Sequence, residues 1–205
     1  MVNLIRKDLV IQKRLLPLYL AIMAFYFLID LPSLAWLPFI MSISLIMNAF
    51  YYDEKDNINI LLNSLPYTRK QIVSSKYIGA LIFTALFIGV TMVGSFIVNG
   101  MELAFSWKDV LQTFGLVMAW LTVIFPFFYK FKQQYLVIGA VIFFIISMFT
   151  FKVVVHLFNE QFGEVVQWII SLPELQLYSF TALVLLLLYW GSWLLSIRIY
   201  ERKVF

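Results

Sequence analysis

The feature that most restricts how this chain can fold is a series of long apolar runs that contain no charged residue. There are six of them: residues 15–29, 31–52, 77–101, 110–129, 133–151 and 175–197. A helix that rises 1.5 Å per residue needs roughly 20 residues to cross a hydrocarbon core ~30 Å thick. Five runs are long enough, and the first, with 15 residues, is marginal. The pattern predicts six transmembrane helices in a single transmembrane domain over residues 1–205.

Composition supports a membrane protein and selects its class. Hydrophobic residues make up 63% of the chain and the mean hydropathy is +0.92, which is outside the range of soluble domains. Lipid offers no partner to free backbone N–H and C=O groups, so only helices and closed barrels can span a membrane. The apolar runs are continuous rather than alternating, which favours helices. We therefore expect an all-α, multi-pass membrane protein.

Lysine and arginine divide unevenly between the two sides that six spans would create. Thirteen of the 15 lie in the N-terminal segment, in loop 53–76, in the short loop after residue 129 and in the C-terminal segment, whereas only Lys108 and Lys152 fall on the opposite side. Cations favour the cytoplasmic side of a membrane. Both termini and loop 53–76 are therefore expected in the cytoplasm, and the net charge of +4 reflects topology rather than a nucleic-acid partner.

Two segments outside the spans carry a further pattern. Residues 1–14 place basic and apolar side chains on different arcs of a helix, which predicts a helix lying along the cytoplasmic head groups, although Asp8 and Gln12 interrupt that separation. Residues 152–174 are too apolar for a plain outer loop and too interrupted for another span. This outer segment is predicted to form a short helix or a re-entrant hairpin.

The longest polar interruption of the chain is loop 53–76, between the second and third spans. Four apolar residues repeat there with the i, i+3, i+4, i+7 spacing of one helical face: Ile58, Leu61, Leu62 and Leu65. Pro66 ends that short helix, and Thr68 with Gln71 three positions later is the pattern of a capping box. The loop is predicted to contain a short helix, a proline break and a capped helix that continues into the third span.

The apolar face of that short helix has two interpretations. It is a docking surface for another protein, or it lies on the lipid surface. Its flanks are Asn57, Asn59, Asn63 and Ser64 rather than lysine, a poor match to anionic lipid and a good match to a groove on a protein. Protein docking is therefore the favoured interpretation.

The residues needed for catalysis are scarce. The chain contains one histidine, His156, and no cysteine, so it lacks the clusters of an intramembrane protease and any cysteine-based metal site. No P-loop pattern G-x-x-x-x-G-K-[ST] occurs in the sequence. The chain is expected not to be an enzyme, and if it pumps a substrate, another polypeptide must supply the energy.

Ion coupling has one candidate, Asp30 at the outer end of the first span, since the five longer runs contain no charged residue. Polar residues inside the spans either line a path or form hydrogen bonds that hold helices together. They are Ser42, Ser44, Asn48, Thr84, Thr91, Ser95 and Thr122.

The segment YYDEKDNINILLNSLPYTRKQIVSSKYIGAL, residues 51–81, resembles the corresponding loop in the membrane subunits of type-2 ATP-binding-cassette (ABC) exporters. In that family the loop carries a coupling helix that docks into the ATPase subunit. The resemblance implies a partner-binding site with an acidic start, an apolar face and a turn. Its residues would be Asp53, Glu54, Asp56, Ile58, Leu61, Leu62, Ser64, Leu65, Pro66, Thr68 and Arg69.

The same resemblance implies the partners. ATP and Mg would be bound by a separately encoded ABC ATPase subunit, with no cofactor in this chain, and a second permease copy, identical or related, would complete the transporter. The chain is similar to permeases of the bacterial cytoplasmic membrane that export amphipathic peptides, such as the phenol-soluble modulin exporter. An ion-coupled secondary carrier that uses Asp30 and a non-transporting membrane scaffold are the alternatives.

Overall fold

The structure of the chain is a computed structural model that describes residues 1–28, 36–55, 58–98, 105–139, 141–142, 145–146, 150, 160–163, 167, 171 and 173–203. Its helices are α1 (Val2–Gln12), α2 (Leu16–Leu28), α3 (Trp36–Lys55), α4 (Ile58–Ser64), α5 (Arg69–Val98), α6 (Trp107–Lys130) and α8 (Glu174–Glu201). Residues 133–139 are also helical. The part of the chain that the structure describes contains no β-strand, which confirms the all-α class.

Three helices of the described part are long and apolar enough to cross a membrane: α5, α6 and α8. They coincide with the third, fourth and sixth apolar runs. Helices α1 and α2 pass the same criterion only when taken together, and they are bent by 71° at the break between them. The six-span topology stays a prediction, because most of run 133–151 and of the outer segment 152–174 lies outside the described residues. Residues His156 and Asp30 lie outside them as well.

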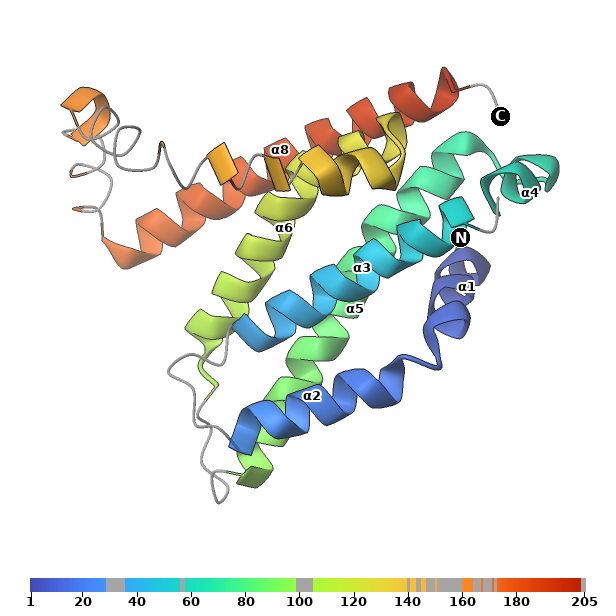
Figure 1. Ribbon diagram of the computed structural model, residues 1–205. Helices are drawn as coiled ribbons and strands as arrows, with labels where there is room; N and C mark the ends of the chain where they lie inside the picture. Colours follow the sequence, from blue (N-terminus) through green and yellow to red (C-terminus); the bar gives the residue numbers. More distant parts are fainter. Residues whose placement is uncertain are drawn as a thin grey trace.

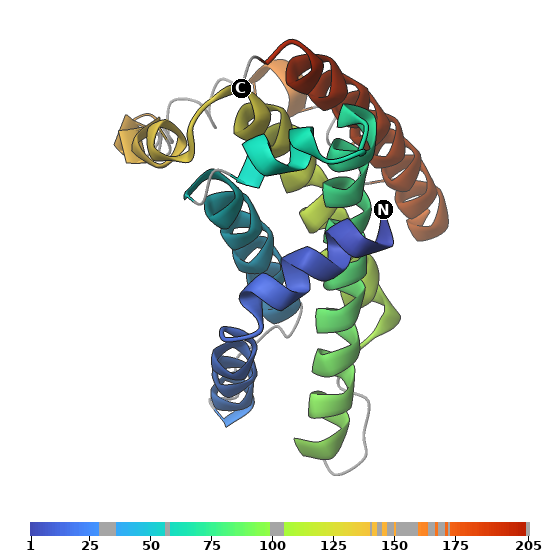
Figure 2. The ribbon, with the colours of Figure 1, turned by 90° about the vertical axis from the view of Figure 1, so that its right-hand side faces the viewer.

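The helices pack as two neighbouring pairs, α3 with α5 and α6 with α8, and α5 also packs against α8 (Figure 1). The core between them is closed by fully buried side chains such as Val73, Val117, Leu121 and Phe125. Helix α1 crosses over α5 rather than running beside it, as Figure 2 shows. It therefore lies obliquely across α3 and α5, and its contacts with α3 extend from Asp53 near the end of that helix to Leu45 in its middle.

The polar side chains inside the spans mainly support helix structure. The hydroxyls of Thr84 and Thr91 donate to the carbonyls of Ala80 and Phe87, one turn earlier in the same helix. The Ser42 and Thr122 hydroxyls do the same with Pro38 and Met118. These bonds satisfy the hydroxyls within each helix, as expected in an apolar medium.

One polar contact joins three helices instead. The Tyr77 hydroxyl on α5 lies 2.8 Å from the hydroxyls of both Ser192 and Ser196 on α8, and the Ser192 hydroxyl donates to the Thr122 carbonyl on α6. For the polar residues named in this and the preceding paragraph, hydrogen bonds within the protein explain their presence in the spans, and no role in a transport path is needed.

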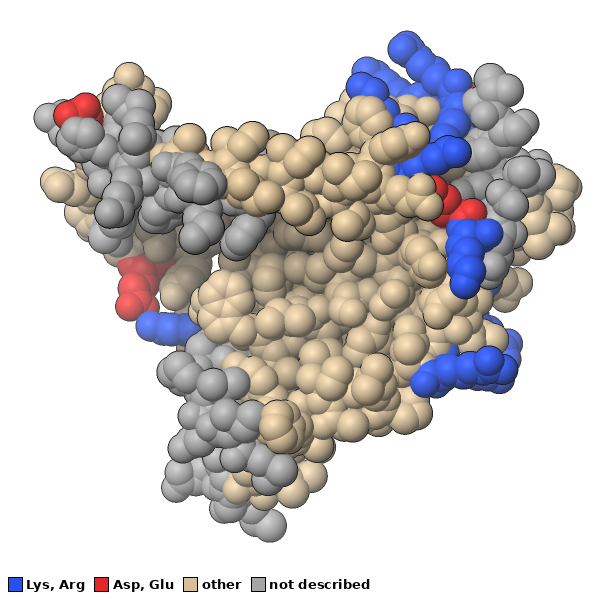
Figure 3. All heavy atoms as spheres, in the orientation of Figure 1, with Lys and Arg blue, Asp and Glu red and all other residues tan. Residues whose placement is uncertain are grey.

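One end of the helices differs from the rest of the molecule. The start of α1, helix α4 and the end of α8 all lie there (Figure 1). On the face drawn in Figure 3, lysine and arginine side chains gather at the same end, while the middle of the surface carries other residues. We call this the basic end. Six spans and the count of cations predicted such a gathering of both termini and loop 53–76.

Candidate functional site at the basic end

Helix α4 turns its apolar residues in two directions. Leu62 is 4% exposed and belongs to the core, and Ile58 packs against that core. By contrast, Leu61 and Leu65 are 59% and 42% exposed. Residues three apart on a helix differ by about 60° around its axis, so the 58/62 row and the 61/65 row are neighbours that a core boundary can separate. The four residues predicted to form one apolar face are thus divided into a buried row and an exposed row. Only the exposed row is available to a partner.

The turn after α4 has the predicted local structure. The helix ends at Ser64, and the Tyr67 N–H donates to the Leu65 carbonyl at 2.7 Å across Pro66. The Thr68 N–H donates to the Gln71 side chain at 3.0 Å, and the Gln71 N–H donates to the Thr68 hydroxyl at 3.2 Å. This reciprocal pair is the capping box, and α5 continues from it for 30 residues. The proline break and the capped helix are confirmed.

Arg69, the first residue of α5, ties this turn to the end of α8. One nitrogen of its guanidinium donates to the carbonyls of Tyr200, Glu201 and Lys203 at 3.1, 2.6 and 3.0 Å. The last carbonyls of a helix have no partner within the helix and carry partial negative charge. A cation with several donors stabilises them, and the α4–α5 turn is thereby fixed to α8.

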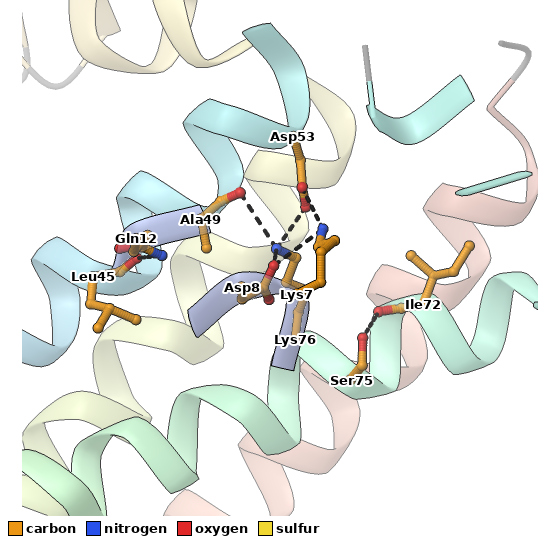
Figure 4. Close-up of polar contacts among 9 residues, drawn as sticks. All are labelled: Lys7, Asp8, Gln12, Leu45, Ala49, Asp53, Ile72, Ser75 and Lys76. Carbon is orange, nitrogen blue, oxygen red and sulfur yellow. Dashed lines mark hydrogen bonds and ion pairs between the residues drawn. The ribbon is translucent and has the colours of Figure 1, made fainter. Parts of the chain in front are cut away.

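Asp53, expected as part of an acidic surface, is buried in a cluster of four charges: Lys7 and Asp8 on α1, Asp53 on α3 and Lys76 on α5 (Figure 4). Its two carboxylate oxygens lie 2.5 Å from the Lys7 ammonium and 2.6 Å from the Lys76 ammonium. The Lys76 ammonium also lies 2.9 Å from Asp8, and that of Lys7 lies 3.2 Å from Asp8. Two positive and two negative groups therefore balance where three helices meet.

Because the four-charge cluster is largely buried, its pairing matters for the stability of the fold. Asp8 and Lys76 are both buried, and Lys76 additionally donates to the Ala49 carbonyl and lies 5.3 Å from the centre of the Phe50 ring. Desolvation alone would raise the pKa of the Asp53 carboxyl, but the charges and hydrogen bonds of Lys76 and Lys7 outweigh it and hold the pKa below its ordinary value. Because unpaired buried charges are costly, the cluster locks α1 to the ends of α3 and α5.

Glu54, the acidic residue after Asp53 in the predicted site, also contacts the protein itself. Glu54 accepts a hydrogen bond of 2.8 Å from the backbone N–H of Gln133, which joins the end of α3 to the segment after α6. Asp56 lies outside the described residues. The structure therefore uses Asp53 and Glu54 to hold the basic end together and leaves Leu61 and Leu65 facing outward.

Sequence reasoning missed Lys7, Asp8 and Lys76 as a unit. The signal was present in α1, where Leu4, Asp8 and Gln12 recur every four residues and form the buried face. The Gln12 side chain donates to the Leu45 carbonyl at 3.0 Å, so the polar residues that interrupt the amphipathic pattern are those that contact the protein. An acidic residue on the buried row of a helix is a signal for a buried partner.

The described residues contain no group of three or more His, Cys, Asp or Glu side chains placed to hold a metal ion. A sequence model of the family described as ABC-2 family transporter protein matches residues 3–201, from α1 to the end of α8. No curated protein matches the chain, and no solved structure does.

Proposed function

The chain belongs to the ABC-2 family of transporter proteins, and from that premise we propose that it exports amphipathic or hydrophobic peptides, or other amphiphiles, using ATP hydrolysed by a separate subunit. Family membership makes it a multi-pass membrane protein and a permease subunit of an ABC transporter, which works with an ATP-binding partner. The peptide substrate is supported by the similar layout of bacterial peptide-exporting permeases, a single transmembrane domain, whereas residues 51–81 indicate the transporter family and not its substrate.

The observation that supports α4 as the coupling helix is a pair of exposed leucines, Leu61 on the helix and Leu65 directly after it, beside the buried Leu62. Exposed apolar residues on a protruding element at a charged surface are typical of an interaction site. Leu62 anchors α4 in the core, so a partner that grips the exposed pair moves the helix and not merely a side chain. On this proposal the ATPase subunits, which carry ATP and Mg, bind here on the cytoplasmic side.

Motion of α4 has two routes into the spans. The first route follows the chain after α4. Motion reaches α5 through Pro66 and the Thr68 cap, and it reaches the end of α8 through Arg69. The second route passes through α3, which precedes α4. Motion of α3 reaches the four-charge cluster and therefore α1 and α5. Packed elements transmit displacements as rigid bodies. Closure of two ATPase subunits would thus tilt α3, α5 and α8 together, in each of two permease copies.

The test is purification of the full chain from membranes of its native host in a mild detergent. We expect a second polypeptide with a P-loop to accompany it, and ATP hydrolysis in the complex to require the permease. Reconstituted vesicles should transport amphipathic peptide only when supplied with ATP. Transport that persists without ATP, but collapses with the ion gradient and in Asp30→Asn, would support the secondary carrier. A partner without hydrolysis or transport would support the scaffold.

A further inference from the structure

A cavity of about 350 Å³ lies at the basic end. The end of α3, the start of α5, the end of α6 and the residues that follow α6 and α8 surround it. This volume is within the range of small-molecule sites. The residues relevant to its chemistry are Tyr129, Lys130, Lys132, Gln133 and Lys203. They come from two distant parts of the chain, so the fold and not a local motif creates the cavity.

The charge in this cavity is unbalanced. Asp53 and Glu54 also line it, but Asp53 is paired with Lys7 and Lys76, and the single negative charge of Glu54 acts on Lys203. Lys130 and Lys132 form no ion pair with any described residue. The walls therefore offer more positive charge than the protein's own carboxylates neutralise, and this favours an anion.

The surroundings of Lys203 reflect this excess of positive charge. Its ammonium donates to the Tyr129 carbonyl at 3.2 Å. Partial burial, the main cause, lowers the pKa of Lys203, Glu54 opposes this shift, and the nearby Lys132 adds to it. Two lysines from different segments thus lie close enough to repel each other. A bound anion would relieve both the repulsion and the desolvation.

Two residues of the cavity wall each carry a buried polar atom without a partner, and these atoms identify the ligand further. The Tyr129 hydroxyl and the Gln133 side-chain oxygen have no hydrogen-bond partner among the described residues, and Tyr129 is only 5% exposed. Buried polar groups are nearly always hydrogen-bonded. The tyrosine hydroxyl can donate to an anionic oxygen, and the glutamine oxygen accepts from a hydroxyl. The complement is an anion that also carries a hydroxyl donor.

We propose that this cavity binds a phosphate group bearing a hydroxylated substituent, as in the head group of an anionic glycerophospholipid or in soluble glycerol phosphate. Lys132, Lys203 and the Tyr129 hydroxyl contact the phosphate oxygens, and the Gln133 oxygen accepts from the substituent. Tyr135, which is exposed and follows Gln133 by two residues in the chain, suits the membrane interface, where a lipid head group would lie. This site does not depend on the ATPase partner or on the exported substrate.

The experiment measures ligand binding to the full chain in a neutral detergent, by native mass spectrometry and by the shift in unfolding temperature. The probes are dioleoyl phosphatidylglycerol, dioleoyl phosphatidylcholine and glycerol 3-phosphate. The test variants are Lys132→Gln with Lys203→Gln, and Tyr129→Phe. The matched control is Lys13→Gln with Arg14→Gln, which removes two exposed cations that do not line the cavity.

Wild type and the control should bind phosphatidylglycerol equally and more tightly than phosphatidylcholine, while the double lysine variant loses affinity about tenfold or more. Tyr129→Phe should also bind more weakly, yet without ligand it should unfold at or above the wild-type temperature, because it removes an unpaired buried hydroxyl. Displacement of the lipid by glycerol 3-phosphate would identify a soluble source for the same site. Equal affinity in all four proteins, or equal binding of both lipids, would overturn the proposal.

Discussion

Replacing both Leu61 and Leu65 with Asp is expected to abolish co-purification of the ATP-binding subunit while membrane insertion stays intact. Both side chains are largely exposed and outside the core, so the variant should fold. Burying a leucine at an interface is worth about 1.5–3 kcal/mol, and a buried carboxylate adds a desolvation cost. Loss of both leucines therefore predicts affinity at least about 100-fold weaker. The measurement is the amount of ATPase recovered per permease from solubilised membranes.

The matched control for this experiment is Leu61→Met with Leu65→Met, which keeps an apolar surface of similar size. It should retain the ATPase. Leu62→Asp is unsuitable as a docking test, since that side chain is buried and its loss would unfold the basic end. Normal ATPase recovery with the double aspartate variant would remove α4 as the coupling helix and leave the family membership untouched.

The second large effect concerns stability. Lys76→Met should destabilise the folded permease by about 3–5 kcal/mol, the usual cost of leaving a buried carboxylate without its partner. Asp8 and Asp53 would then share the single ammonium of Lys7. For a chain of this size the expected fall in unfolding temperature in detergent is roughly 10 °C. Lys13→Met, which removes an exposed cation from the same end, should change it little.

A double variant distinguishes loss of charge balance from loss of packing. Lys76→Met with Asp8→Asn leaves one cation, Lys7, facing one anion, Asp53, and should recover much of the lost stability. Double-mutant cycles of contacting residues report such coupling. If the double variant is as unstable as the sum of the two single variants, the cluster does not act as one electrostatic unit.

Local patterns in the sequence predicted local structure well. The Pro66 break and the capping box of Thr68 and Gln71 depend on neighbours within a few residues, and both form as expected. The charge-free runs predicted helices, and α5, α6 and α8 are long and apolar enough to cross a membrane. These features require no knowledge of how distant segments meet.

Features that depend on tertiary contacts were beyond the sequence. The periodicity of α4 grouped Ile58 and Leu62 with Leu61 and Leu65, but only the position of the core decides which row faces outward. Asp53 was expected in the acidic start of the partner-binding site from the family resemblance, whereas its two cations come from α1 and α5. Segments 46 and 23 residues away in the chain cannot be paired from one sequence without covariation.

The prediction that residues 1–14 form an amphipathic helix also missed contacts with other helices. Asp8 and Gln12 weakened the pattern of a helix lying on head groups, yet they are among the residues by which α1 contacts α3 and α5. An interfacial location of α1 stays a prediction. The structure adds that its polar inner row is occupied by the protein, so a head group could contact only its other faces.

The most direct measurement places a photo-activated cross-linking residue at position 61 in the native host and identifies what it captures. Leu61 is exposed on α4, and Leu86, exposed in the middle of α5, is the matched position within a span. The expected result is a covalent adduct at position 61 with a polypeptide that contains a P-loop, and no such adduct at position 86. Capture of lipid alone at both positions would contradict a coupling role for α4.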